Sequence, residues 1–210
     1  MNIDIHQLSP QQCYQYLVSA ILPRPIAWIS TQSAAGLSNL APFSFFSVAS
    51  VAPPVLSVTQ VNPRDRAEKD TVRNLRETGN CVVNIVNQQL AAQMNASCAD
   101  YPANVSEFSA VGIEPIASQQ VPTPGVALSP VRFECRLRDI IAIGEGPQAG
   151  QLVLLDVVHL HIDDTVLEQG RILPDRLDAI GKLGGDDYSL IRERFQMTRP
   201  QAPATPLPPT

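Results

Sequence analysis

The chain has 210 residues, enough for one large domain with a sizeable buried core. It carries 20 acidic and 15 basic residues and a net charge of −5, with no dense run of Lys and Arg, so its composition argues against nucleic-acid binding. Only 5% of the residues are aromatic and 17% are charged, whereas 19 are Pro, a mixture typical of a β-rich domain with many turns.

The N-terminal residues 1–6 lack the basic region and the long apolar run of a secretory signal, and no apolar run reaches membrane-spanning length. We therefore expect a soluble, cytoplasmic protein that binds no membrane. The cysteines are widely scattered and have no zinc-site spacing, so we expect buried or semi-buried thiols rather than metal ligands. They are Cys13, Cys81, Cys98 and Cys135.

A helix is predicted near the N-terminus. Ser9 has the position of an N-cap, Pro10 suits the first helical turn, and Gln12 completes a capping box. This helix should end before Pro23.

Strands account for most of the remaining regular structure that the sequence predicts. Apolar or alternating runs predict them at 26–31, 39–46, 55–59, 81–86, 131–143 and 151–162. The run 151–162 is the longest and is expected to be a central strand that pairs with 131–143. Short strands joined by turns favour a barrel or a sandwich.

Helical and irregular segments separate these strands. Val72 and Leu75 lie three residues apart ahead of Gly79, which has the position of a helix C-cap. Helical composition also marks 88–97, and a short helix is predicted over 189–196. Residues 105–125 are loop-like, and the Pro-rich segment 201–210 is expected to be an extended or disordered tail after a single domain over 1–200.

The segment Asn39-Leu-Ala-Pro-Phe-Ser-Phe-Phe46 differs from an ordinary buried strand. Ala41, Pro42 and Ser44 leave the main chain reachable, and a planar heterocycle needs fixed main-chain groups at its edge and apolar atoms against its face. The alternative is a barrel-corner strand with a Pro-induced bulge. The segment alone does not decide between them.

A cationic loop precedes the second predicted helix. Arg64, Lys69 and Thr71 would surround free N–H groups at the positive end of the helix dipole, which suits a phosphate. Asp70 fits better as the N-cap of that helix. An ordinary solvated loop before a capped helix explains the same residues equally well.

Two further groups of residues are candidates for the substrate side of a site. His159 and His161 lie on one face of a predicted strand, but without a third ligand they favour a barrel or dimer contact over a metal site. Tyr188 follows Gly184-Gly185 and would either fold over a pocket or simply pack beside a turn.

Several motifs in the same order resemble the flavin reductase-like family of FMN-binding split β-barrels. They are Arg24-Pro-Ile-Ala-Trp-Ile-Ser-Thr31, Gly36, Asn39–Phe46, Pro53-Pro54, Lys69-Asp-Thr71, Asn74, Gly79, Val83-Asn84, Leu183-Gly-Gly185, Tyr188 and Arg199-Pro200. The resemblance covers residues 10 to 200. It implies a mainly β, Greek-key-like split barrel with peripheral helices, assembled as a homodimer with FMN near the subunit interface.

The resemblance also implies which residues bind the cofactor. Trp28, Ser30 and Thr31 would lie along the ribityl chain and phosphate, and Asn39, Leu40, Ala41, Pro42, Phe43 and Ser44 would meet the edge of the isoalloxazine ring. Arg64, Lys69, Asp70 and Thr71 would lie at the phosphate. Trp28 equally suits a plain core position.

The implied activity is NAD(P)H:flavin reduction, either alone or as the reductase component of a two-component oxygenase. Hydride passes directly from the nicotinamide to the flavin, so no catalytic side chain is expected. Two alternatives stay open: an FMN-binding electron carrier or storage protein, and a flavin-free structural or interaction protein. The sequence does not distinguish NADH from NADPH.

Overall fold

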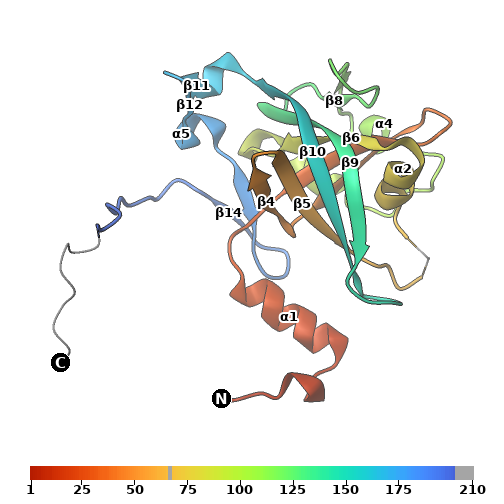
Figure 1. The fold of residues 1–210 in the computed structure, drawn as a ribbon, viewed down its shortest axis with the longest axis vertical. Coiled ribbons are helices and arrows are strands. Elements are labelled where there is room, and N and C mark those ends of the chain that lie inside the picture. Colours follow the sequence, from red (N-terminus) through yellow and green to blue (C-terminus); the bar gives the residue numbers. More distant parts are fainter. Residues whose placement is uncertain (66–67, 202–210) are drawn as a thin grey trace.

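A computed structural model describes residues 1–65 and 68–201, and its main body is a curved antiparallel sheet (Figure 1). The spatial order of the seven strands is β3 (Ser38–Phe43), β2 (Ala27–Gln32), β6 (Asn80–Ile85), β9 (Val131–Ala142), β10 (Gly150–Ile162), β5 (Pro54–Val61) and β4 (Phe46–Val51). The predicted mainly β architecture is confirmed, and β3 and β4 form the two edges at which the barrel is split.

The long hairpin of β9 and β10 forms the middle of the sheet. Their register runs from Gln151 opposite Ala142 to Ile162 opposite Val131, and β10 pairs with β5 on its other side. The predicted central strand and its hairpin partner are therefore confirmed.

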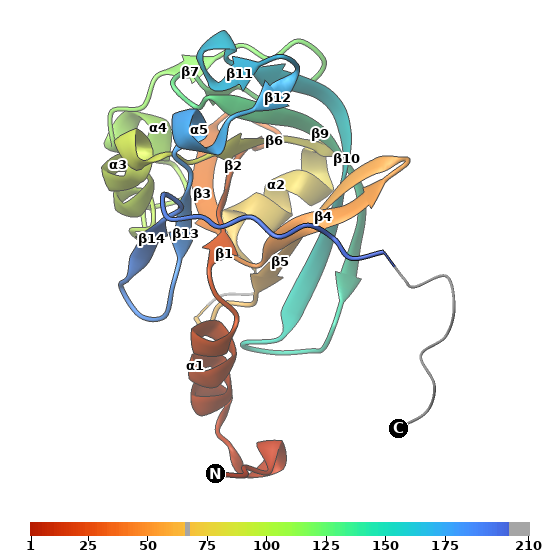
Figure 2. The ribbon, with the colours of Figure 1, turned by 90° about the vertical axis from the view of Figure 1, so that its left-hand side faces the viewer.

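Helix α2 (Asp70–Thr78) lies within the curve of the sheet (Figure 2). Val72 and Leu75 are buried there in a core cluster that also contains Ile29 and Leu155. The helix ends at Gly79, whose φ of 71° lies in the left-handed region, as predicted for a C-cap. The helix thus fills the barrel and directs its N-terminus toward β3.

A second apolar layer covers the opposite face of β2 and β3. It contains Trp28, Leu40, Met94 and Phe108, which belong to one core cluster beneath the outer helices. Those helices are η2 (Gln88–Leu90), α3 (Ala91–Ala96) and α4 (Glu107–Ala110). Because both faces of β2 are covered, its residues are buried without alternation.

The N-terminal helix α1 (Pro10–Ala20), which follows η1 (Ile5–Gln7), projects from the barrel (Figure 1). The Ser9 main-chain N–H donates to the Gln12 side chain at 3.0 Å, and the Gln12 N–H donates to Ser9 Oγ at 3.3 Å. The predicted capping box is confirmed. Val18 is buried, whereas Tyr14 and Ile21 are exposed.

Smaller elements complete the described chain. They are β1 (Arg24–Pro25), β7 (Pro115–Ile116), β8 (Gly125–Val126), η3 (Asp164–Val166), β11 (Leu167–Glu168), β12 (Arg171–Ile172), α5 (Pro174–Leu177), β13 (Ile180–Lys182) and β14 (Tyr188–Leu190). Among the described residues, no helix is long and apolar enough to cross a membrane.

Two predictions about the 39–46 segment are wrong. The segment is not one strand, because β3 ends at Phe43 and β4 begins at Phe46. Pro42 forms no bulge: it lies in unbroken register opposite Trp28. Because Leu40 directs its N–H away from β2, Pro42 occupies an equivalent outward position, where a missing N–H costs no ladder bond.

Two helical predictions are also wrong. Asp70 is the first residue of α2 rather than its N-cap, which is Lys69, and the Asp70 carboxylate pairs with Arg73 at 2.7 Å. Residues 189–196 form no helix, because β14 continues to Leu190 and the following arginines bind α5 and its C-terminal neighbour Asp178. Most of the predicted Pro-rich tail, 202–210, lies outside the described residues.

Candidate functional site

A polar cavity of about 220 Å³ lies between the edge strand β3 and the N-terminus of α2. Asn39, Ala41 and Pro42 line it from β3, and the loop that follows α3 forms the opposite wall. The complete lining is Asn39, Ala41, Pro42, Lys69, Asp70, Thr71, Ser97, Cys98, Ala99, Asp100, Tyr101 and Glu107. The cationic loop and the 39–46 segment therefore meet at one place.

Two side-chain hydrogen bonds hold α2 beside the strands. Asn39 Nδ2 donates to Thr71 Oγ1 at 3.1 Å, and Asn74 Nδ2 donates to Thr31 Oγ1 at 3.1 Å. Both bonds join an amide to a hydroxyl across the gap between helix and sheet. They fix the position of the first turn of α2 relative to β3.

The donor groups at this end of α2 fit an anion. The N-cap residue Lys69 makes no side-chain cap hydrogen bond, and Asp70 and Thr71 at the start of α2 line the cavity, so the positive end of the helix dipole lies beside it. Lys69 adds an ammonium group, whose Nζ lies 5.4 Å from the centre of the Phe43 ring. A flavin phosphate matches this combination of main-chain donors, hydroxyl and cation.

An apolar cavity of about 100 Å³ adjoins the polar one, since Pro42 and Cys98 line both. Its remaining lining is Ile26, Phe43, Ser44, Met94, Lys182 and Tyr188. The Tyr188 hydroxyl donates to Asn95 Oδ1 at 3.1 Å, and Lys182 Nζ lies 4.0 Å from the ring centre of Tyr188. A polar end joined to an apolar end suits a flavin, whose phosphate and ring have those properties.

Four of the predicted cofactor-binding residues are buried inside the protein rather than lining either cavity. Trp28 is 0% exposed, and its Nε1 donates to Ser97 Oγ at 2.9 Å. The Ser30 hydroxyl donates to the Pro124 carbonyl at 2.6 Å, and Thr31 accepts the bond from Asn74. Leu40 belongs to the outer core cluster. Trp28 thereby supports the cavity wall through Ser97.

The structure separates the other predicted residues from this pair of cavities. Arg64 lines a cleft of about 800 Å³ beside α1, which shares Lys69 with the polar cavity. His159 lies on β10, with Nδ1 3.2 Å from Glu134 Oε1, and His161 follows on the same strand. The lining residues of the two cavities include neither histidine.

Several residues of the cavity walls were not predicted from the sequence, among them Glu107 and Cys98. Glu107 accepts the Leu40 N–H at 2.8 Å. Cys98 lies where the two cavities meet and is exposed, so the prediction of a buried or semi-buried thiol is wrong for this residue. Arg24 is buried, and its guanidinium donates to Leu183 O at 2.8 Å and to Ser44 Oγ at 3.3 Å. Arg24 stood in a family motif, whereas Glu107 and Cys98 stood in segments without a recognisable pattern.

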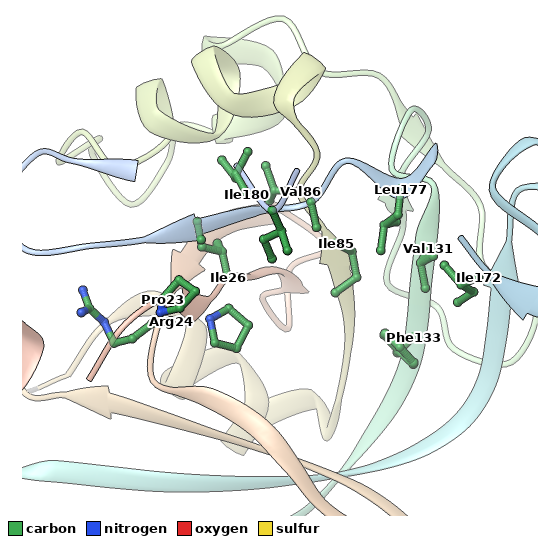
Figure 3. A pocket seen from close by; sticks show the side chains of 14 residues that line it. Pro23, Arg24, Ile26, Ile85, Val86, Val131, Phe133, Ile172, Leu177 and Ile180 are labelled. Atoms are coloured by element: carbon green, nitrogen blue, oxygen red, sulfur yellow. The ribbon is translucent and has the colours of Figure 1, made fainter. Parts of the chain in front are cut away.

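A larger apolar cavity, about 360 Å³, shares Ile26 with the smaller apolar cavity (Figure 3). Ile26, Ile85, Val131 and Phe133 line it from the main barrel side, and Ile172 and Leu177 line it from the later segment. Its lining is almost free of polar side chains, so it does not suit a phosphate-bearing ligand.

Comparison with known proteins identifies the family. A model of the flavin reductase-like domain matches residues 19–177. The chain belongs to the flavin reductase-like family. As a member of this family, the protein is a flavoprotein oxidoreductase, and its split barrel agrees with that assignment.

Relatives of similar length include YwrF of Bacillus subtilis, an uncharacterized protein that is 36% identical over 198 residues, 92% of this chain and 96% of the relative. An uncharacterized protein of Halalkalibacterium halodurans is 35% identical over 202 residues, covering 95% of this chain and 97% of its own. The similarity therefore extends beyond the matched domain.

Two solved structures are similar over nearly the whole chain. Nitrilotriacetate monooxygenase component B from Bacillus cereus has a TM-score of 0.89 and 33% identity, covering 94% of this chain and 98% of that one. The 2-nitrobenzoate 2-nitroreductase NbaA of Pseudomonas fluorescens has a TM-score of 0.86 and 27% identity, with coverage of 95% and 96%.

Proposed function

We propose that this family member binds FMN and passes hydride from NADH or NADPH to it, as an NAD(P)H:flavin reductase. The observation that carries the proposal is the polar cavity at the N-terminus of α2 joined to an apolar cavity beside β3. A mononucleotide flavin has one phosphate, one ribityl chain and one apolar ring system, which correspond to these two environments.

The proposed roles of the residues follow from their positions. Lys69 and Thr71, with the first-turn N–H groups of α2, would hold the phosphate. Asn39, Ala41 and Pro42 would border the ribityl chain, while Phe43, Ser44 and Tyr188 would border the ring. Bound flavin supplies the hydride chemistry, and the protein residues bind it, orient it and exclude water.

A partner oxygenase is part of the proposal. The similar structure from Bacillus cereus carries the name of a monooxygenase component, and its 33% identity extends over 94% of this chain. Reduced flavin made by this protein would then serve an oxygenase as its electron source.

We also propose a homodimer. The large apolar cavity in Figure 3 and the exposed side chains of Val158 and Leu160 on β10 offer apolar surface to a second copy. Sedimentation equilibrium of the full chain should give twice the monomer mass of 22.8 kDa. A monomer at all accessible concentrations would contradict this part of the proposal.

The cofactor assignment is tested by titrating purified, flavin-depleted protein with FMN and following the flavin absorbance and fluorescence. Changing Lys69 and Thr71 together to Ala should weaken FMN binding by about ten-fold or more, because hydrogen bonds to a charged group contribute roughly 1.5–3 kcal/mol each. Binding of riboflavin, which lacks the phosphate, should change little.

A matched control uses the other end of the same helix. Arg76 and Thr78 are also a cation and a threonine on α2, but neither lines the polar cavity. Their joint replacement by Ala should leave FMN affinity nearly unchanged. Equal weakening by both double variants, or no FMN binding by the unmodified protein, would reject the phosphate assignment.

A further inference from the structure

Glu107 places a buried carboxyl group in the wall of the polar cavity. The residue is 9% exposed, and its Oε2 accepts the Leu40 N–H at 2.8 Å. That N–H points away from β2, on the open edge of β3. Glu107 thus satisfies a buried main-chain donor, and it brings an acidic group to the wall of the proposed phosphate site.

Other acidic groups surround the same cavity. Asp70 and Asp100 line it together with Glu107, and Lys69 is the only cation among the described lining residues. Asp70 forms an ion pair with Arg73 outside the lining set. The remaining titratable groups in the wall are Cys98 and Tyr101. The site therefore combines anion-binding donors with an excess of carboxyl groups.

These surroundings favour the protonated form of Glu107. Burial raises the pKa of its carboxyl group most strongly, and hydrogen bonds from the Leu40 and Glu107 main-chain N–H groups only partly offset this. The charge of Asp70 makes a smaller contribution that raises the pKa. A phosphate entering the cavity adds negative charge beside this carboxyl group and shifts the balance in the same direction.

Protonation also improves the hydrogen bonding available to a phosphate. A carboxylate can only accept hydrogen bonds, whereas a carboxylic acid donates through its hydroxyl and still accepts through its carbonyl oxygen. Protonated Glu107 can keep the Leu40 bond and donate to a phosphate oxygen.

We propose that Glu107 takes up a proton from solvent when the flavin phosphate binds, and that this positioning residue thereby links cofactor affinity to pH. The inference rests on the proposed FMN site. If binding of FMN is coupled to uptake of one proton by Glu107, the FMN affinity falls as the pH rises. The fall is up to about ten-fold per pH unit between the pKa of Glu107 in the free protein and its higher pKa in the complex. Riboflavin should show no such dependence, because it brings no phosphate charge.

The test is isothermal titration calorimetry of FMN into the flavin-depleted full chain. Repeating it in buffers of different ionisation enthalpy, from about pH 5.5 to about pH 8.5, counts the protons taken up on binding. Wild-type protein should take up more protons with FMN than Glu107→Gln does. Because the FMN phosphate titrates in both proteins, their difference isolates Glu107.

Glu107→Gln retains an acceptor for Leu40 and a donor for the phosphate. It should therefore bind FMN with a flatter pH dependence and more tightly than wild type at the alkaline end. Asp70→Asn is the matched control, since it removes a carboxyl group from the same cavity but only the smallest of the influences on the pKa of Glu107, and it should retain most of the proton uptake.

Equal proton uptake by wild type and Glu107→Gln at every pH would overturn the inference while leaving the FMN site intact. If Glu107→Gln does not fold, wild type is titrated with FMN and with riboflavin at about pH 8, where a free phosphate monoester is already a dianion. Equal proton uptake with the two flavins at that pH overturns the inference. Absence of FMN binding by wild type would overturn the proposed function and the inference with it.

Discussion

Cys98 lies at the junction of the two cavities, and its surroundings determine how reactive its thiol is. Sγ donates to the Met94 carbonyl at 3.7 Å. Cys98 is exposed, yet partial desolvation by the surrounding wall raises the pKa of its thiol, and the positive charges of Lys182 and Lys69 only partly offset this. The thiolate is the reactive form, so at neutral pH less of this thiol is reactive than of a fully hydrated one.

Alkylation should therefore be slow at neutral pH and should accelerate as the pH rises past the usual thiol range, about 8.5. Bound FMN should protect Cys98, because the residue lines both proposed cofactor cavities. Iodoacetamide labelling followed by peptide mass spectrometry measures both effects. Cys13 on α1 is the internal control, and FMN protection of Cys13 but not Cys98 would contradict the placement of the flavin.

At the scale of single residues, polar side chains that line the cavity were easier to predict from the sequence than buried side chains that hold the cavity wall in place. Lys69, Thr71 and Asn39 were recognisable because cations, hydroxyls and a helix start occur together in the chain. Glu107 was not, because it lies in a loop-like segment whose contact with Leu40 exists only after α4 packs on β3. Trp28 was ambiguous until its partner Ser97 was known.

Arg24 connects elements that are distant in the sequence. Its guanidinium donates to main-chain carbonyls of Ile21 and Leu183 at 3.3 and 2.8 Å, to the Val18 carbonyl, and to Ser44 Oγ. The end of α1, the turn between β13 and β14, and the apolar cavity are thereby tied to one side chain. The planar guanidinium of Arg carries five N–H donors, so it can reach acceptors in several directions at once, which a Lys ammonium cannot do equally well.

Arg24→Lys should lower the free energy of unfolding by about 1–3 kcal/mol, since a single ammonium leaves some of these buried acceptors unpaired. Urea denaturation measures the change. Arg176→Lys is the control, because Arg176 pairs with Glu168 at an exposed position and its loss should cost about 0–1 kcal/mol. A similar small effect in both variants would contradict the connecting role of Arg24.

Elements with a clear period or cap were predictable from the sequence. The Ser9–Gln12 capping box and the Gly79 C-cap both depend on local chemistry, and both are present. The boundary between β3 and β4 was missed because Phe43, Phe45 and Phe46 continue the apolar pattern through the bend. The helix predicted over 189–196 failed because pairing of β14 with β13 overrides local helix propensity.

At the scale of the whole molecule, α2 fills the barrel from one side while its N-terminus opens toward the split edge (Figure 2). The outer helices cover the opposite face of β2 and β3 and supply the far wall of the polar cavity. The main-chain donors at the start of α2 therefore lie beside the edge strand β3, and apolar residues line the adjoining smaller cavity. It suits a protein that holds and orients a flavin while the flavin transfers the hydride.

Reduction of the bound flavin is measured by anaerobic stopped-flow mixing of the FMN-loaded protein with NADH and with NADPH. We expect at least one nucleotide to bleach the flavin absorbance, with a rate that saturates as its concentration rises and exceeds that for free FMN. Flavin that remains bound and oxidised with both nucleotides would contradict the reductase function and favour an electron carrier.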